Sequence, residues 1–265
     1  MFPGAAADRT DAAYAVVGAP LDASTTGQPG TRFGPREVRA AARAFEDYDR
    51  HTDRHFSALS VYDHGDIEPT DDTREYLDFL RGVVADYREE GVVPLVVGGE
   101  HTVSVAAVRA LDPDVVVCLD AHLDLRESYA GNPLSHATAM RHALGVADEL
   151  VVLGARAGSE SEWDRAERGD VTAVAPADVP DWEPDIEGAV YLSVDVDATD
   201  AGFAPGTGTP EPFGLDPATI HEVVRRVAPG AVGFDVVEVN DRDDGQAAAL
   251  AAKLLRAFVY VHADG

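Results

Sequence analysis

Acidic and imidazole side chains follow an apolar run in the segment 115–124, VVVCLDAHLD. The run Val115–Leu119 is typical of a strand buried on both faces of a parallel sheet. Asp120, His122 and Asp124 come next at a spacing of two, and an extended backbone would place all three on one side. Carboxylates and an imidazole just beyond the carboxyl end of such a strand suit a divalent metal ion. We therefore expect a metal site at this strand end.

Two further apolar runs end in the same kinds of side chain. Asp195 and Asp197 follow the run 189–194 and are again two residues apart, while His101 follows the run 92–97 and a glycine pair. A single aspartate at a strand end is usually a turn residue or a helix cap, and a lone histidine is usually structural. The repeated pairing favours a shared site instead. The predicted ligands are His101, Asp120, His122, Asp124, Asp195 and Asp197.

The composition narrows the classes of partner. The chain has 265 residues and a formal net charge of −27 at pH 7, a field that repels nucleic acid and anionic membrane surfaces. The acidic residues are spread along the chain, which predicts a solvated surface suited to high salt and a halophilic protein. No long apolar run and no signal-like N-terminus are seen, so we expect a cytoplasmic protein. Cys118, the only cysteine, lies in an apolar run and is expected to pack in the core.

Strand and helix patterns alternate about eight times, which predicts an α/β fold with a parallel sheet covered on both faces. We expect one domain over residues 1–265, because no linker divides the chain. The helix at 71–87 is expected to be capped by Thr70 or Asp71. The segment 197–215 has hardly any regular pattern, and loops of this length inside a domain are usually functional.

The predicted elements are the following. Strands are predicted over residues 14–19, 61–67, 92–97, 115–119, 150–153, 171–174, 189–195 and 232–237. Helices are predicted over residues 36–48, 71–87, 101–111, 135–144, 159–168, 217–227 and 246–261.

Five motifs in a fixed order point to a known family. They are GAPLDASTTGQPGTRFGPREVR at 18–39, GGEHT at 98–102, DAHLDLRESYAGNPLSHATAMR at 120–141, SVDVDATDAGFAPGTGTPEPFGL at 193–215 and GFDVVEVND at 233–241. With them the chain resembles the ureohydrolases, the arginase and agmatinase family, over most of its length. The N-terminal string and the PGTGTPE loop are similar to the agmatinase branch. One departure is Asp200-Ala201, where many members carry a proline.

The resemblance implies a three-layer α/β/α sandwich on a mostly parallel eight-stranded sheet and two Mn²⁺ ions per chain, held by the six residues named above. It also implies a homo-oligomer, a trimer or a hexamer. His136 matches the family's proton-shuttle histidine, Glu238 its guanidinium-binding carboxylate and Thr209 a pocket-lining position. Asp124 is expected to take part in proton transfer as well as metal binding. Glu211 is our own assignment for the distal ammonium of the substrate.

The implied activity is hydrolysis of agmatine to putrescine and urea, a step of polyamine biosynthesis. The loop after Asp124 lacks the polar residues with which arginases hold an amino acid, which favours a decarboxylated guanidino substrate. The same reaction on guanidinobutyrate, aminopropylagmatine or arginine remains an alternative. So do a non-catalytic metal-binding member of the fold and an amide hydrolase of the deacetylase type, although the latter needs only one zinc ion.

Overall fold

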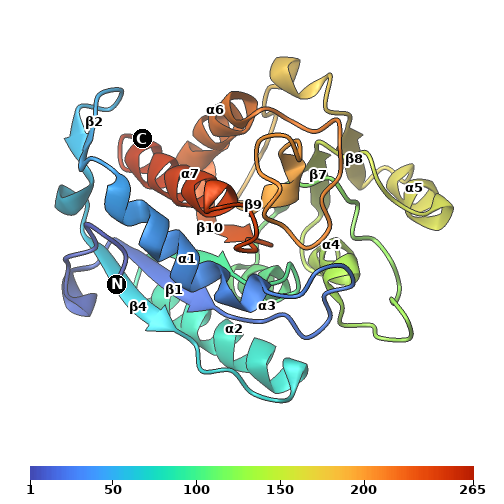
Figure 1. Cartoon of the computed structure of the whole chain (residues 1–265), viewed down its shortest axis with the longest axis horizontal. Coiled ribbons are helices and arrows are strands. Elements are labelled where there is room, and N and C mark those ends of the chain that lie inside the picture. The colour runs from blue at the N-terminus through green and yellow to red at the C-terminus, as the bar shows by residue number, and fades with distance from the viewer.

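The computed structural model describes residues 1–265 and is built on one eight-stranded sheet (Figure 1). The strand order is β4-β1-β5-β10-β9-β6-β7-β8, and every pair of neighbours is parallel. All the carboxyl ends therefore lie along one edge. The strands are β1 (Tyr14–Ala19), β4 (Val61–Asp66), β5 (Val93–Gly98), β6 (Val115–Leu119), β7 (Glu149–Leu153), β8 (Val171–Val174), β9 (Val190–Asp195) and β10 (Ala231–Val237).

Helices cover both faces of the sheet (Figure 1). One face carries α1 (Gly34–Ala41), α6 (Pro217–Val227) and α7 (Gln246–His262). The other carries α2 (Thr73–Glu89), α3 (Val103–Leu111) and α4 (Ala139–Ala143), and α5 (Glu160–Ala166) packs beside β8.

The central strands contribute alternate residues to two hydrophobic cores. In β6, Val115, Val117 and Leu119 join one core, and Val116 and Cys118 join the other. This explains why such strands read as unbroken apolar runs. The predicted three-layer α/β/α sandwich on a parallel eight-stranded sheet is confirmed.

Two predicted helices differ from the observed ones in length. The helix expected at 36–48 ends at Ala41, continues as a 3-10 turn over Ala42–Ala44 and leads into a small hairpin. The apolar spacing hid this end, because Phe45 still packs against the core after the backbone has become extended. The segment expected as one helix at 135–144 is a 3-10 turn followed by α4. The hairpin strands are β2 (Tyr48–Asp49) and β3 (Arg54–His55).

The cap predicted for α2 is wrong by one residue. Asp72 is the N-cap, and its carboxylate accepts hydrogen bonds from the backbone N–H groups of Arg74 and Glu75. Thr70 instead donates its hydroxyl to the carbonyl of Asp72, and so supports the cap from outside the helix. No helix in the structure combines the length and the apolar character that a membrane span requires.

Candidate metal centre and substrate pocket

The two aspartate-rich motifs leave their strands through the same local turn. Asp120 Oδ1 accepts the N–H of His122 at 2.7 Å, and Asp195 Oδ1 accepts the N–H of Asp197 at 2.8 Å. The backbone is thus turned, and Asp124 even adopts a φ of +49°. The expectation that an extended backbone aligns these side chains is wrong, because the first aspartate of each motif folds the chain back onto its own carboxylate. The side chains still converge.

His101 faces three of the predicted ligands through one ring nitrogen. Its Nδ1 lies 3.0 Å from Asp124 Oδ2, 3.1 Å from Asp120 Oδ2 and 3.6 Å from Asp195 Oδ2. All four side chains are buried. They form the first of two groups of candidate ligands.

His122 faces the second group. Its Nδ1 lies 2.9 Å from Asp197 Oδ2 and 3.6 Å from Asp120 Oδ1. Asp120 therefore presents one oxygen to each imidazole and lies between the two groups. The N–H of Ala121 donates to Asp197 Oδ1 at 3.1 Å, which joins the ends of β6 and β9 directly. The structure brings all six predicted ligands together.

Buried groups behind His101 determine which of its nitrogens faces the carboxylates. Ser193 Oγ donates its only proton to Asp235 Oδ1 at 2.6 Å, and Tyr191 donates to the other oxygen of Asp235. Ser193 Oγ must then accept the Nε2–H of His101, at 3.1 Å. The neutral ring is left with a bare Nδ1 toward the carboxylates, which is the orientation that metal-binding histidines commonly have.

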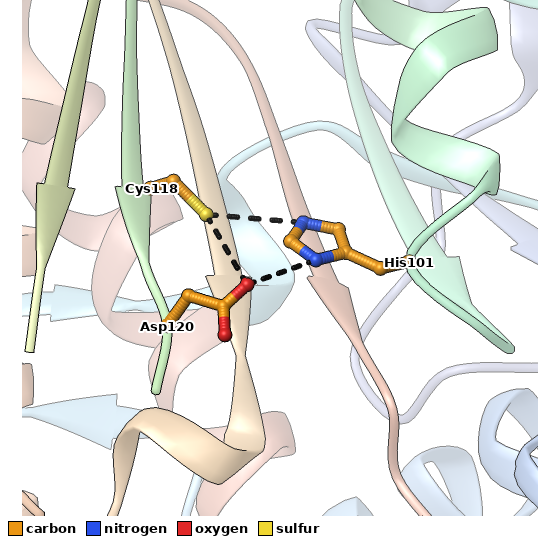
Figure 2. Close-up of side chains that lie close together, drawn as sticks. All are labelled: His101, Cys118 and Asp120. Atoms are coloured by element: carbon orange, nitrogen blue, oxygen red, sulfur yellow. Dashed lines mark hydrogen bonds and ion pairs between the residues drawn. The ribbon is translucent and has the colours of Figure 1, made fainter. Parts of the chain in front are cut away.

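Cys118 faces Nε2 of the His101 ring, the nitrogen that also meets Ser193 (Figure 2). Its Sγ is 3.8 Å from Nε2 and 3.9 Å from Asp120 Oδ2, whereas the Asp120 carboxylate also faces Nδ1. Burial raises the pKa of this thiol, so it stays protonated and is a poor ligand. The arrangement agrees with the expected packing role of Cys118.

The donor set fits a divalent cation. His101 Nδ1 is fully buried and has no hydrogen-bond partner, although carboxylate oxygens of Asp124 and Asp120 lie 3.0 and 3.1 Å from it. A cation among these atoms satisfies the nitrogen and the oxygens together. Oxygen-rich ligation with two imidazoles suits Mn²⁺ among other transition metals.

The pKa shifts show how crowded the carboxylates are. Burial raises the pKa of Asp124 to about 6, and the charge of Asp120 adds to this effect. Burial, followed by the charges of Asp197 and Asp120, holds the pKa of Asp195 well above its usual value. Without a cation, burial and the neighbouring negative charges both disfavour ionisation of these groups. Positive charge is what the arrangement lacks.

His136 lies beside the ligand groups and is fixed by the N-terminal loop. Its Nε2 lies 2.9 Å from Thr26 Oγ1, and its backbone N–H donates to Ser24 Oγ at 2.9 Å. Ser24 in turn donates to the buried carboxylate of Glu100. Burial lowers the pKa of His136 to about 4, and the charges of the two other site histidines act in the same direction. The imidazole is therefore neutral at pH 7.

Glu238 has a buried carboxylate with one free oxygen. Its Oε1 accepts the N–H of His101 at 2.9 Å and lies 3.7 Å from His136 Nδ1, while Oε2 has no partner. The residue adopts a φ of +62°, which is costly for a side chain with a Cβ and is typical of functional sites. Burial raises the pKa of Glu238 well above its usual value. A cationic donor in front of Oε2 would reverse that shift.

A cavity of about 300 Å³ opens beside these groups. Thr209 and Glu211 line it, as do His122, Asp124 and His136. Thr209 Oγ1 lies 3.4 Å from Asp197 Oδ2, and Glu211 Oε1 lies 3.9 Å from His122 Nε2. The predicted substrate-binding residues are thus next to the candidate ligands.

Several residues of the site were not predicted. Thr26 lines the cavity from a loop that the 18–39 motif marked only in general terms. Glu162 is buried, lines the cavity and accepts hydrogen bonds from Leu125 N and from both Ser159 N and Oγ. The Ser-x-x-Glu spacing of a capping box, residues 159–162, was the available signal for this pair.

Comparison with known proteins places the chain in a family. The sequence model of the arginase family matches residues 12–260, and the chain belongs to the arginase family. It is 33% identical to an agmatinase of Pyrococcus horikoshii, covering 94% of this chain and 91% of the other. It is 34% identical to the N(1)-aminopropylagmatine ureohydrolase of Thermococcus kodakarensis, covering 92% and 88%.

A solved structure supports the same placement. The agmatine ureohydrolase of Thermoplasma volcanium superposes with a TM-score of 0.93 at 33% identity, covering 99% of this chain and 94% of that one. The expected enzyme class, a hydrolase acting on guanidino groups, is confirmed at that level.

Proposed function

We propose that the chain hydrolyses agmatine to putrescine and urea with two Mn²⁺ ions bound. The observation that carries this proposal is the pair of imidazoles, His101 and His122, which face separate groups of carboxylates with Asp120 shared between them. The first ion would be held by His101, Asp124 and Asp195, the second by His122 and Asp197. When bound, such a pair of ions activates water at neutral pH.

Glu238 is the proposed binding group for the guanidinium. Its unpartnered Oε2 is buried beside the candidate ligands, so a planar cation would gain a charge-assisted hydrogen bond there. Such a contact orients the guanidinium carbon toward the metal centre. It also explains why a carboxylate is kept in a buried position where burial alone disfavours its charge.

His136 and Asp124 are the proposed proton carriers. Hydrolysis adds the water oxygen to the guanidinium carbon, breaks one C–N bond and moves both protons of the water to the leaving nitrogen, which departs as an ammonium. His136 is neutral at pH 7, so it first accepts a proton and then donates it to the amine. Asp124 lines the cavity next to the other candidate ligands, so its carboxylate is placed to take part in the initial transfer.

The tail of the substrate is proposed to bind Glu211 and Thr209. Glu211 lines the cavity and remains partly exposed, so its carboxylate can meet an ammonium at the far end of the substrate. Aminopropylagmatine, which has a longer cationic tail, is a second candidate. A relative named N(1)-aminopropylagmatine ureohydrolase is 34% identical over most of the chain.

The decisive experiment measures urea release at molar salt from protein stripped of metal and reloaded with Mn²⁺. Agmatine is compared with aminopropylagmatine, guanidinobutyrate and arginine. The proposal expects the highest kcat/KM for agmatine and no urea without metal. Faster release from arginine would contradict the substrate assignment. Urea from none of these compounds, with Mn²⁺ shown to be bound, would favour a non-catalytic metal-binding protein.

Four wider expectations belong to the same proposal. The chain is taken as one ureohydrolase domain over 1–265, supported by a family match over 12–260 and a single continuous sheet. It is taken to work in the cytoplasm as a trimer or hexamer. The net charge of −27 supports a halophilic protein, whose unfolding midpoint rises between low and molar salt.

A further inference from the structure

The irregular segment 197–215, which contributes to the cavity wall, is fastened by one arginine from another strand end. Arg156 lies beyond β7, and its backbone N–H donates to the carbonyl of Ala121, between the candidate ligands Asp120 and His122. Its guanidinium has five N–H groups, and the structure gives it five hydrogen bonds, all to backbone carbonyls. The acceptors are Asp197 at 2.7 Å, Glu211 at 2.8 Å, Pro212 at 3.0 Å, Gly154 at 3.0 Å and Ala198 at 3.4 Å.

These bonds join the two ends of the segment. One nitrogen, Nη2, donates both to the carbonyl of Asp197 and to the carbonyl of Glu211. The backbone carbonyls of a candidate metal ligand and of the candidate tail-binding residue are therefore bonded to the same nitrogen of Arg156. No carboxylate pairs with this guanidinium, although the chain has 48 acidic residues.

The packing around Arg156 leaves no slack. A Cβ at Gly214 would lie 2.6 Å from Arg156 Nη2 and 2.7 Å from the carbonyl of Ala198, so no side chain fits there. Asp200 accepts the N–H of Gly214 at 3.0 Å, and Thr199 pairs with Leu215 across the base of the segment. These contacts pack the two ends of segment 197–215 directly against the guanidinium of Arg156.

We propose that Arg156 is a positioning residue that determines which length of substrate tail the enzyme prefers. By holding the Glu211 backbone to that of Asp197, it fixes the span from the metal centre to the carboxylate that meets the distal ammonium. The substrate class is then a guanidino compound with a cationic tail of one preferred length. This inference rests on the proposed function, because it gives Glu211 the tail-binding role.

The test replaces Arg156 with lysine, which keeps the charge but cannot reach five carbonyls. Arg168→Lys is the matched control, because Arg168 is exposed beyond α5. Each protein is assayed with agmatine, with homologues one methylene shorter and longer, and with butylguanidine, which has no ammonium. Hydrogen exchange of the peptide spanning 199–214 is measured on the same proteins.

Two results are expected of Arg156→Lys and not of Arg168→Lys. Exchange of segment 199–214 becomes at least about tenfold faster, since its anchoring bonds are lost. The KM for agmatine rises about tenfold, the preference among the three chain lengths falls to near unity, and kcat/KM for butylguanidine changes less than about twofold. Wild-type exchange together with the wild-type length preference in Arg156→Lys would overturn the inference.

A second variant guards against misfolding of the first. Arg156→Met keeps a stem of similar length but has no N–H donor, so it loses all five bonds and is expected to reproduce both changes. If the wild type hydrolyses none of the compounds, the proposed function fails. The exchange measurement then decides alone whether Arg156 holds the segment. Unchanged exchange in both folded variants would reject the inference independently of activity.

Discussion

His101 and His262 lie at opposite ends of the strands and show what surroundings do to the same side chain. At the carboxyl end, His101 Nδ1 has three carboxylates within 3.6 Å and no hydrogen-bond partner. At the amino end, His262 Nδ1 meets the Tyr14 hydroxyl at 2.9 Å and Nε2 meets the carbonyl of Ala231 at 3.1 Å. Both ring nitrogens of His262 are thus satisfied by neutral groups.

The pKa shifts follow the same contrast. Burial opposes protonation of His101, but the carboxylates of Asp120 and Asp124 outweigh it and place the pKa well above its usual value. Burial lowers the pKa of His262, and no carboxylate opposes this. The surroundings of His101 therefore favour a bound cation. Those of His262 already satisfy its ring with neutral hydrogen bonds and aromatic contacts. Residue type alone does not separate a ligand from a structural histidine.

Removing the shared carboxylate should have the largest effect. Asp120→Ala takes one oxygen from each ligand group, so urea release should fall by more than the roughly 10–100-fold that loss of an outer partner of a metal ligand costs. Mn²⁺ bound per chain, measured after dialysis, should fall from two to one or none. The exposed Asp164→Ala is the control and should retain both. Full activity in Asp120→Ala would contradict the proposal that Asp120 is shared between the two metal ions.

Replacing the proton carrier should lower the rate without loss of metal. His136→Asn removes the proton-accepting nitrogen but keeps a polar group near Thr26, and kcat should fall by about 10²-fold. The KM for agmatine and the Mn²⁺ content should change little. An unchanged kcat would assign the proton transfer to Asp124 alone. The comparison uses Mn²⁺-loaded protein at saturating substrate.

Metal removal should lower the stability of the folded protein through the candidate ligands at the carboxyl ends of the strands. At about 100 times the dissociation constant, Mn²⁺ contributes about 2.7 kcal/mol to the free energy of unfolding. For a chain of this size that is a shift in Tm of roughly 5–10 °C between chelated and reloaded protein. Asp120→Ala should show little of this shift. Equal shifts in both proteins would place the stabilising ion elsewhere.

The smallest expected effect is the pH dependence at the amino end. The pKa of His262 is lowered in the folded state, so the unfolded chain binds more protons below its usual pKa of about 6.5. The stability from neutral His262 is therefore full above that pH and is lost as the pH falls toward the folded pKa. The difference in free energy of unfolding between wild type and His262→Phe should shrink from pH 7.5 to pH 5.5. A difference that grows would mean that His262 is charged in the folded state.

The ligands were predictable because residue type, strand ends and motif order all agree for them. His101 and the two aspartate motifs follow apolar runs whose carboxyl ends must share one edge in a parallel sheet. The turn that actually aligns Asp120 with His122 was not predicted, since an aspartate at a strand end suits both turned and extended backbone.

Other parts of the site depend on contacts that leave no local pattern. Thr26 meets His136 across 110 residues of chain. Arg156 binds backbone carbonyls, which every residue has, so its role cannot be read from the side chains around it. The cap of α2 was misplaced because three neighbouring residues, Thr70, Asp71 and Asp72, are all good caps.

The place of β10 in the sheet bears on the order in which the protein assembles during synthesis. β10 lies between β5 and β9, so the strands that lead to His101 and Asp195 reach their final spacing only when residues 231–237 pair with both. A nascent chain that ends before β10 already contains all six candidate ligands but not the strand that spaces them. Such long-range pairing is slow and comes late in folding. We therefore expect the proposed metal ions to be captured after translation is nearly complete.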